Sequence, residues 1–261
     1  MNFAGFDFAV WLAALPVLLI AATFTWLLSL PLRNVAIVDS LWSLMLFSAG
    51  VVYALNSDPR SPRLALVLWL LAIWAMRLAI YITRRNIGKG EDHRYQAIRA
   101  RNEPRFALKS LYLVFWLQAF LAWVISLPLL GAFSSTAPIG WLDYAGVVLW
   151  VIGFVFEAGG DWQLARFKKD PANAGQVMDR GLWRYTRHPN YFGEFCIWWG
   201  FWLIALSAGA WWSILGSALI SYLLLRVSGV SLLEKDIGNR RPRYADYVLK
   251  TNAFFPGPPR K

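Results

Sequence analysis

The sequence predicts an all-α integral membrane protein, a bundle of seven transmembrane helices forming a single domain over residues 1–261. Of its 261 residues, 58% are hydrophobic and 16 are tryptophan, which is more apolar surface than a soluble domain of this size buries. Apolar stretches long enough to cross a bilayer recur along the chain, and no internal repeat is visible. The basic residues are concentrated between these stretches, as is typical of membrane proteins.

A transmembrane helix needs about 20 mostly apolar residues, and seven stretches meet this requirement. They cover residues 8–31, 35–55, 64–83, 107–131, 142–165, 191–208 and 211–233. Only a short segment separates the last two, so their boundary is the least defined. Turn-forming residues at 57–62 (SDPRSP) and 134–138 (SSTAP) predict short loops on one side of the membrane. No basic residue precedes the first stretch, so we expect it to be retained as a helix and not removed as a signal peptide.

The distribution of lysine and arginine predicts the orientation of the helices. With the N-terminus outside, 22 basic residues fall in the inner connections and 2, Arg60 and Arg63, in the outer ones. Loops rich in lysine and arginine stay on the cytoplasmic side. We therefore expect the N-terminus outside and the C-terminus, with its irregular FFPGPPRK end, in the cytoplasm.

Composition also excludes several classes of site. The net charge of +11 is spread over the connections between apolar stretches, so it predicts contact with membrane lipid and no nucleic-acid partner. One cysteine and two histidines leave no set of residues for a disulfide or for a cysteine- or histidine-rich metal centre. We therefore expect no metal.

Ionisable residues inside the predicted helices share one depth. At about 1.5 Å per residue, they all fall within roughly two turns of the predicted inner surface. These residues are Asp39, Arg77, Glu157, Asp161, Glu194 and Arg226. Charges inside a membrane are costly and normally face a cavity or a partner, so this pattern predicts one polar cavity open to the cytoplasm. The alternative is a set of structural ion pairs, such as Asp39 with Arg77.

The groups expected around this cavity indicate its ligand. Carboxylates and an asparagine suit ribose hydroxyls or an amide, while the basic residues of the inner connections suit phosphate. Together they predict a nucleotide cofactor. No G-x-G-x-x-G or P-loop motif is present, so neither a Rossmann unit nor a P-loop supplies the site.

At residues 181–194 (GLWRYTRHPNYFGE) the sequence resembles the C-terminal region of the steroid 5α-reductase family, specifically its bacterial branch. Residues 38–42 (VDSLW), 90–95 (GEDHRY) and 240–247 (RRPRYADY) are similar to other hallmarks of that branch. Members of this family are seven-helix membrane enzymes that use NADPH to saturate a double bond conjugated to a ketone. The resemblance therefore implies reduction of the Δ4 bond of a 3-oxo steroid or a similar lipophilic enone, by a protein of the bacterial inner membrane that we expect to be a monomer.

The resemblance and the residue types together give the expected site. The cofactor-binding candidates are Glu157, Asp161, Lys168, Arg180, Tyr185, Arg187, His188, Asn190, Glu194, Arg226 and Tyr244. Animal members hold the substrate ketone with a glutamate on the second helix and a tyrosine on the third. The nearest counterparts here are Asp39 and Trp74, with Tyr81 as a further candidate, so these three are the expected catalytic residues.

Two other interpretations of the sequence remain open. The RHPNY string also resembles the isoprenylcysteine carboxyl methyltransferases, which bind S-adenosylmethionine in a comparable membrane fold, and sterol reductases of the lamin-B-receptor type. Adenosylmethionine carries no phosphate and would leave the basic residues without a role. A non-catalytic lipid or sterol binder, whose basic loops contact anionic lipid, is a third possibility.

Overall fold

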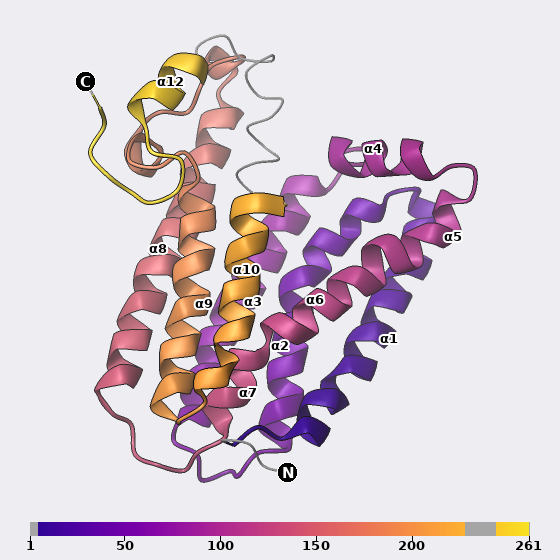
Figure 1. Ribbon diagram of the computed structural model, residues 1–261. Helices are drawn as coiled ribbons and strands as arrows, with labels where there is room; N and C mark the ends of the chain where they lie inside the picture. The colour runs from indigo at the N-terminus through magenta and orange to yellow at the C-terminus, as the bar shows by residue number, and fades with distance from the viewer. Residues whose placement is uncertain (1–4, 228–243, 261) are drawn as a thin grey trace. The chain divides into compact units, whose positions relative to one another are not determined.

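The computed structural model describes residues 5–227 and 244–260, and within these ranges it contains helices and no β-strand (Figure 1). The chain divides into two compact units. The first unit comprises Met1–Ile139 and Ala205–Leu215, and the second comprises Gly140–Ile204 and Gly216–Lys261. The all-α prediction is confirmed for the described residues.

Five helical segments of the described chain are long and apolar enough to cross a membrane, so the chain is membrane-embedded. They are Phe8–Leu32 (α1), Val35–Leu55 (mostly α2, Val38–Leu55), Arg63–Asn86 (α3), Phe106–Phe133 and Trp141–Lys169 (α8). The segment Phe106–Phe133 combines α5 (Phe106–Ser110), a π-helical turn, α6 (Leu117–Ile125) and α7 (Leu127–Phe133). The first five expected spans match these segments to within about four residues at each end.

The last two expected spans correspond to helices that are not among these five segments. The sixth coincides with α9, Pro189–Ser207. The seventh corresponds to a shorter apolar helix, Trp211–Val227, which contains α10 (Ile214–Tyr222). Its expected end, residues 228–233, lies outside the described residues. The total of seven spans and their orientation therefore remain predictions.

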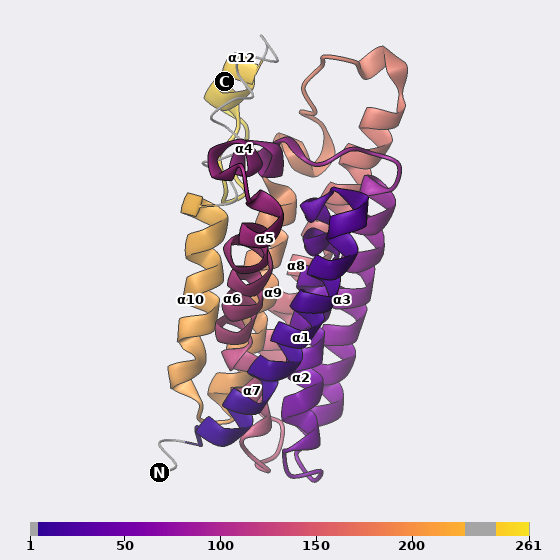
Figure 2. The same ribbon diagram turned by 90° about the vertical axis from the view of Figure 1, so that its right-hand side faces the viewer.

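In the first unit, α2 packs against α1, α3 and α6 (Figure 2). Its buried face includes Met45, Ala49 and Tyr53, and a Cβ added to Gly50 would lie 2.5 Å from the Leu71 side chain. The Tyr53 hydroxyl and the Ser126 hydroxyl are 2.7 Å apart, which satisfies two polar groups within the apolar core. These contacts fix α2, whose first turn carries Asp39.

Arg63 begins α3 and is fully buried, although the count of basic residues assigned it to a loop. Its guanidinium donates hydrogen bonds to the carbonyls of Ala137 (2.8 Å) and Pro138 (3.0 Å) and to the Ser207 hydroxyl (3.1 Å). Arg63 therefore ties together three segments of the first unit, because one guanidinium offers five donors in a fixed plane.

In the second unit, α8 and α9 run antiparallel and approach closely along a row of glycines. Glycines recur every seventh residue on both helices, and they are Gly146, Gly153, Gly160, Gly193 and Gly200. A Cβ on Gly193 would lie 2.4 Å from both the Glu157 nitrogen and the Gly153 oxygen. A Cβ on Gly146 would lie 2.7 Å from the Gly200 oxygen. No larger residue fits at these contacts, which lets the two backbones touch.

The C-terminal segment folds back onto the connection that precedes α9. After α12 (Tyr244–Lys250), Phe254 is buried and its ring lies 5.6 Å from that of Phe195. The Thr186 hydroxyl donates to the Phe254 oxygen (2.7 Å), and the Gly257 nitrogen donates to the Tyr185 oxygen (3.1 Å). The expected irregular end is without helix after α12, but it is packed against its unit.

The glycine row gives a direct test of the α8–α9 contact. Gly193→Ala should destabilise the protein by about 1–3 kcal/mol, because the added methyl group overlaps backbone atoms of α8 that cannot move independently. The matched control is Gly159→Ala, where the added methyl would meet only the Leu182 side chain, at 3.1 Å. Thermal unfolding in detergent should show a clear loss for Gly193→Ala and a small change for Gly159→Ala. Equal melting temperatures for the two variants would contradict this packing.

Candidate functional site

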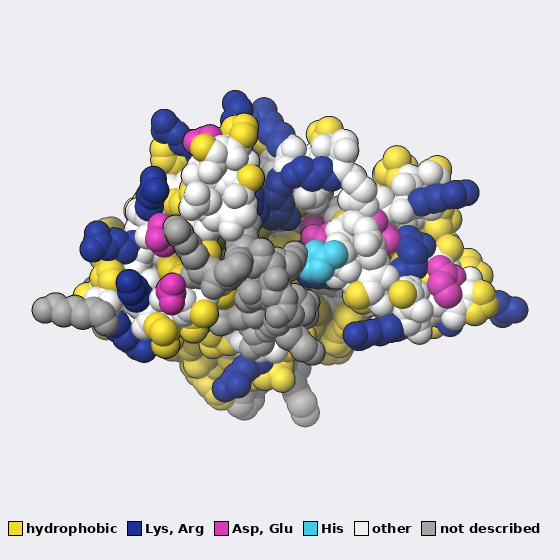
Figure 3. Space-filling model, turned by 90° about the horizontal axis from the view of Figure 1, so that it is seen from above, with side chains coloured by type: hydrophobic (Ala, Val, Ile, Leu, Met, Phe, Trp, Pro, Cys, Tyr) yellow, Lys and Arg dark blue, Asp and Glu magenta, His cyan; other side chains and the backbone are white. Residues whose placement is uncertain are grey.

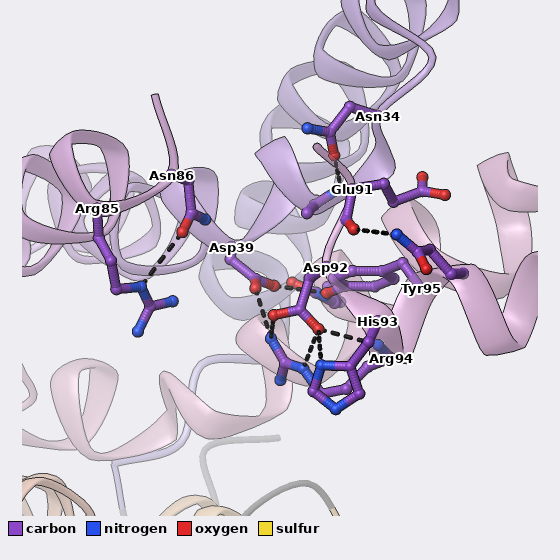
Figure 4. A network of polar contacts seen from close by, with 12 residues as sticks. Asn34, Asp39, Arg85, Asn86, Glu91, Asp92, His93, Arg94 and Tyr95 are labelled. Carbon is purple, nitrogen blue, oxygen red and sulfur yellow. Dashed lines mark hydrogen bonds and ion pairs between the residues drawn. The ribbon is translucent and has the colours of Figure 1, made fainter. Parts of the chain in front are cut away.

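The first candidate cluster joins the start of α2 to α4 (His93–Asn102) and the loop before it (Figure 4). We call it the α2–α4 network. Its members are Asp39, Glu91, Asp92, Arg94, Tyr95, Arg99 and Gln118. It brings together residues 38–42 and 90–95, two segments that were noted in the sequence only as separate hallmarks.

Asp39 is the acceptor at the centre of this network. The Tyr95 hydroxyl donates to one carboxylate oxygen at 2.5 Å, and an Arg94 guanidinium nitrogen donates to the other at 3.0 Å. The Gln118 side-chain amide donates to the Tyr95 oxygen at 3.1 Å. Both Asp39 oxygens are therefore used as acceptors, and Tyr95 is the neighbour that holds a transferable proton.

Burial and the nearby Asp39 charge raise the pKa of Tyr95 well above its usual value, because both disfavour a phenolate. The side chain is 7% exposed. Tyr95 therefore stays protonated at neutral pH. A neutral phenol fixed by a carboxylate is a suitable hydrogen-bond donor to a carbonyl oxygen.

Arg94 links Asp39 to the loop before α4. Its Nε lies 3.0 Å from Asp92, whose carboxylate also accepts from the Arg94 backbone nitrogen and so caps the first turn of α4. Burial lowers the pKa of Arg94, but the charges of Asp39 and Asp92 outweigh burial and raise it. Arg94 is therefore a permanent cation, and it holds the two carboxylates together.

Glu91 holds the other side of the same loop. Its carboxylate accepts two guanidinium hydrogen bonds from Arg99, each 2.8 Å, and one from the Val35 backbone nitrogen at 2.9 Å. Burial raises the pKa of Glu91, but the bonds from Arg99 and Val35 outweigh this effect and lower it. Glu91 thereby ties α4 to the segment just before α2.

The second candidate cluster lies where α8 meets the start of α9, and we call it the α8–α9 cluster. The backbone of Glu157 lies against Gly193, and a Cβ on Gly160 would lie 3.3 Å from the Asn190 nitrogen. Glu194 and Asp161 follow these glycines directly. Glu157 and Asp161 are only 2% and 5% exposed. The structure thus places Glu157, Asp161, Asn190 and Glu194 at one crossing of the two helices, and their role in a site stays a prediction.

The connection before α9 supports this cluster. The Trp183 indole donates to the Gly160 oxygen at 3.0 Å, and the Tyr247 hydroxyl donates to the Trp183 oxygen. Arg187 is buried and donates to the Thr251 oxygen at 2.6 Å, so this candidate cofactor residue also caps the end of α12. His188 is buried and its ring stacks on Tyr191, with centroids 5.7 Å apart.

A pocket of about 610 Å³ lies in the second unit between the connection that follows α8 and the C-terminal segment, and we call it the basic pocket. The polar groups that line it include Arg180, Arg184, Lys250, Arg260, Asp179 and Asp246. Lysine and arginine side chains are also prominent on the surface seen from above (Figure 3). Of the expected cofactor residues, Arg180 lines this pocket.

The remaining candidates are more dispersed. Trp74 is fully buried in α3, whereas Tyr81 is half-buried with the Arg85 guanidinium 5.8 Å from its ring centroid. In the second unit, Lys168, Tyr185 and Arg226 are exposed, whereas Tyr244 is buried at the start of α12. The sequence predicted one cavity shared by Asp39, Arg77 and the acids of α8 and α9. These residues belong to different units, so the shared cavity stays a prediction.

Sequence reasoning missed Arg94, Tyr95 and Gln118 as neighbours of Asp39. An ion pair between Asp39 and Arg77 was the alternative prediction, and in the structure Asp39 accepts hydrogen bonds from Arg94 and Tyr95. Residues 90–95 could have indicated these neighbours, because acidic residues, an arginine and a tyrosine occur together there in a loop between apolar stretches.

The chain matches a protein family whose description assigns no function. A family model described as "Protein of unknown function (DUF1295)" matches residues 25–251. An uncharacterized protein of Schizosaccharomyces pombe is 28% identical over 291 residues, covering 98% of this chain and 83% of that protein. No solved structure matches the chain.

The α2–α4 network predicts an acid-sensitive contribution to stability. Folding lowers the pKa values of Glu91 and Asp92. The two carboxylates therefore contribute fully to the free energy of unfolding above their unfolded pKa values of 4.5 and 3.8, and this stabilisation is lost as the pH falls through their folded pKa values. Glu91→Gln should lower stability at pH 7 by about 1–2 kcal/mol and flatten the decline below pH 4.5. Thermal unfolding measured across pH checks both effects.

The matched control is Asp58→Asn. Asp58 also contacts an arginine, Arg60, and its pKa is lowered to about 2, but the pair is exposed and two residues apart. Such a local pair persists in the unfolded chain, so its removal should change stability little. Identical pH profiles for Glu91→Gln and the wild type would show that the Glu91–Arg99 pair does not stabilise the fold.

Proposed function

We propose that this chain, which belongs to the DUF1295 family, is a membrane-embedded reductase that uses NADPH to saturate the double bond of a lipophilic enone. A 3-oxo-Δ4 steroid or a similarly flat molecule is the proposed substrate. The observation that supports this most is the α8–α9 cluster, where Glu157 and Asp161 are buried beside Asn190 and Glu194. Residues 181–194, which contain half of this cluster, are also where the sequence resembles the steroid 5α-reductases.

The residues present fit a dinucleotide. Buried carboxylates and an asparagine can accept from and donate to ribose hydroxyls and a nicotinamide amide, whereas a purely structural helix contact needs neither. We propose that Glu157, Asp161, Asn190 and Glu194 hold this part of the cofactor, with His188 and Arg226 as further contacts. When bound, the nicotinamide supplies a hydride to the β-carbon of the enone.

The α2–α4 network supplies the proposed hydrogen-bond donor to the ketone oxygen of the substrate. Tyr95 carries a proton and donates it to Asp39 in a 2.5 Å hydrogen bond. Rotation of the hydroxyl hydrogen redirects this donation to a ketone oxygen, where it stabilises the negative charge that develops as the double bond is reduced. Asp39 holds the phenol before this change, and the hydrogen bond that Gln118 donates to the Tyr95 oxygen persists during it. We therefore assign the donor role to Tyr95 and a positioning role to Asp39.

A methyltransferase that uses S-adenosylmethionine is the main alternative. The buried carboxylates of the α8–α9 cluster also suit the amino group of that cofactor. The basic pocket favours the reductase, because four basic side chains line it and adenosylmethionine has no phosphate to bind there.

The proposed location is the bacterial inner membrane, with the N-terminus outside and the site open to the cytoplasm. The support is the excess of basic residues, 22 against 2, in the connections on one side. Labelling cysteines introduced on either side with a membrane-impermeant reagent tests this orientation.

Variants of the two clusters should separate cofactor binding from chemistry. Asp161→Asn and Glu194→Gln should weaken NADPH binding by about 10- to 100-fold, because each lost hydrogen bond to a buried ligand costs about 1–3 kcal/mol. Tyr95→Phe should leave NADPH binding nearly unchanged and slow single-turnover reduction of a 3-oxo-Δ4 steroid by about 10²-fold. Binding is measured by titration of purified protein, and reduction by product formation.

The matched control for the donor is Tyr81→Phe, which removes a hydroxyl from the other tyrosine candidate. It should leave the single-turnover rate close to that of the wild type. A slow Tyr81→Phe with a normal Tyr95→Phe would reverse the assignment of the donor. If Asp161→Asn and Glu194→Gln lose adenosylmethionine binding while the wild type binds no NADPH, the methyltransferase is the correct function.

A further inference from the structure

A pocket of about 380 Å³ lies in the first unit where α1 ends, and we call it the α1–α4 pocket. It is bounded by the end of α1, by α4 and by α5. Its lining includes Leu30, Arg33, Val35, Arg99, Ala107 and Ser110. The Trp26 indole donates to the Ala107 oxygen at 2.9 Å, which holds the end of α1 against α5. The pocket is therefore formed by packed segments of one unit.

The α1–α4 pocket lies at the ends of two membrane-spanning segments. α1 ends beside it, and the segment Phe106–Phe133 begins there. Figure 1 shows α4 lying across the direction of α2 and α3, as a helix at a membrane surface does. Leu32 and Leu108, each next to a residue of the lining, are 62% and 63% exposed. Cationic and apolar side chains are thus adjacent here, as expected where lipid headgroups meet acyl chains.

The charges in the lining favour an anion, because Arg33 and Arg99 contribute to it and no acidic side chain of the described residues does. Arg99 uses Nε and Nη2 for its hydrogen bonds to Glu91, and its Nη1 has no hydrogen-bond partner within the described residues. The Arg33 guanidinium is exposed and likewise has no partner in the described part of the chain. Two guanidinium groups therefore have donors available to one ligand.

The backbone of Arg33 indicates that its side chain is needed where α1 ends. Arg33 has φ 48° and ψ 36°, the left-handed conformation that glycine or asparagine adopts more easily. Among the described residues it is the one non-glycine residue with a positive φ. Its backbone nitrogen donates to the Leu30 oxygen at 3.2 Å, which fixes the turn. An arginine in a position suited to glycine indicates a role for the guanidinium.

The α1–α4 pocket also shares two residues with the α2–α4 network. The Val35 nitrogen and the Arg99 guanidinium both donate to the Glu91 carboxylate, and both residues line the pocket. The Arg99 guanidinium lies over the Phe106 ring, 4.5 Å from its centroid, at the start of α5. A ligand that bridges Arg33 and Arg99 would therefore connect the end of α1 to α4.

We infer that the α1–α4 pocket binds the phosphate of an anionic glycerophospholipid, and that the bound lipid holds α4 in place. Arg33 and the Nη1 of Arg99 donate to the phosphate oxygens, and the acyl chains lie along the exposed apolar residues beside the pocket. A zwitterionic headgroup fits less well, because its ammonium group would meet two arginines. A free phosphate ion would leave the apolar residues without a role. This inference is independent of the reductase function.

The test measures stabilisation by lipids that differ in charge. The full chain is purified in a neutral detergent, and its thermal unfolding is followed during titration with dioctanoyl phosphatidylglycerol or dioctanoyl phosphatidylcholine. Phosphatidylglycerol should raise the melting temperature up to a plateau, because a ligand that binds only the folded state stabilises it. Phosphatidylcholine should raise it much less. Equal effects of the two lipids would overturn the assignment of an anionic headgroup.

Arg33→Gln should require about 10-fold more phosphatidylglycerol for the same rise, because a charge-assisted hydrogen bond to phosphate is lost. Its melting temperature without lipid should stay close to that of the wild type. The matched control is Arg105→Gln, which removes an exposed charge just before α5 and outside the pocket lining. This control should respond like the wild type. A normal response of Arg33→Gln, or equal weakening in both variants, would overturn the site.

Inorganic phosphate is the competing ligand, and it is titrated in the same way. It should give little stabilisation at the concentrations at which phosphatidylglycerol acts. If phosphate alone produces the whole rise in melting temperature and phosphatidylglycerol adds nothing, the pocket binds a free anion and the lipid assignment is wrong.

Hydrogen exchange tests the effect of the lipid on α4. Phosphatidylglycerol should slow exchange of the amides of residues 93–102 in the wild type, and it should do so much less in Arg33→Gln at the same concentration. Slower exchange in other helices with unchanged exchange in α4 would show that the bound lipid does not hold α4, and would overturn that part of the inference.

Discussion

A carboxylate inside a membrane-spanning helix costs about 2.5–3.5 kcal/mol at mid-membrane, so such a group needs polar partners. In the first unit, Asp39 receives hydrogen bonds from Tyr95 and Arg94, so its charge is shared with a loop that folds onto α2. In the second unit, Glu157 and Asp161 are buried where glycines allow α9 to contact α8. In the first unit this cost is therefore offset by hydrogen bonds and an ion pair, and in the second the close helix contact makes polar neighbours necessary for the buried carboxylates.

We propose that the two clusters serve different parts of one reaction. The α2–α4 network holds a proton on Tyr95, with the phenol fixed by Asp39 and Gln118. The α8–α9 cluster offers buried carboxylates and an amide beside a basic pocket, which is a combination suited to a nucleotide. A reductase needs both a hydride carrier and a proton donor, whereas a lipid anchor needs neither. The division of roles is the main physical reason for preferring an enzyme.

Much of the fold was predictable because it follows from local composition. The apolar stretches, the turn residues at 57–62 and the carboxylates at positions 157 and 161, four residues apart, are visible in the sequence and hold in the structure. The seven-residue spacing of glycines on α8 and α9 was visible as well, but it acquires meaning only once the two helices are known to pack together.

The missed features depend on contacts between distant parts of the chain. Asp39 and Arg94 are 55 residues apart, and the basic pocket combines Phe167 with Arg260. No periodicity reports such contacts, so Arg77, at a similar predicted depth, was the natural sequence-based partner for Asp39. The packing of Phe254 against Phe195 was also hidden, because a proline-rich end is normally interpreted as irregular.

The most direct test of the reductase is the transfer of the nicotinamide hydrogen. Purified protein in lipid vesicles is given NADPH deuterated at the transferred position together with a 3-oxo-Δ4 steroid, and the product is analysed by mass spectrometry. A reductase should yield the saturated ketone with one deuterium at the former β-carbon and a solvent proton at the α-carbon. Failure of the protein to bind or oxidise NADPH, together with transfer of a labelled methyl group from S-adenosylmethionine to a lipophilic acceptor, would contradict it.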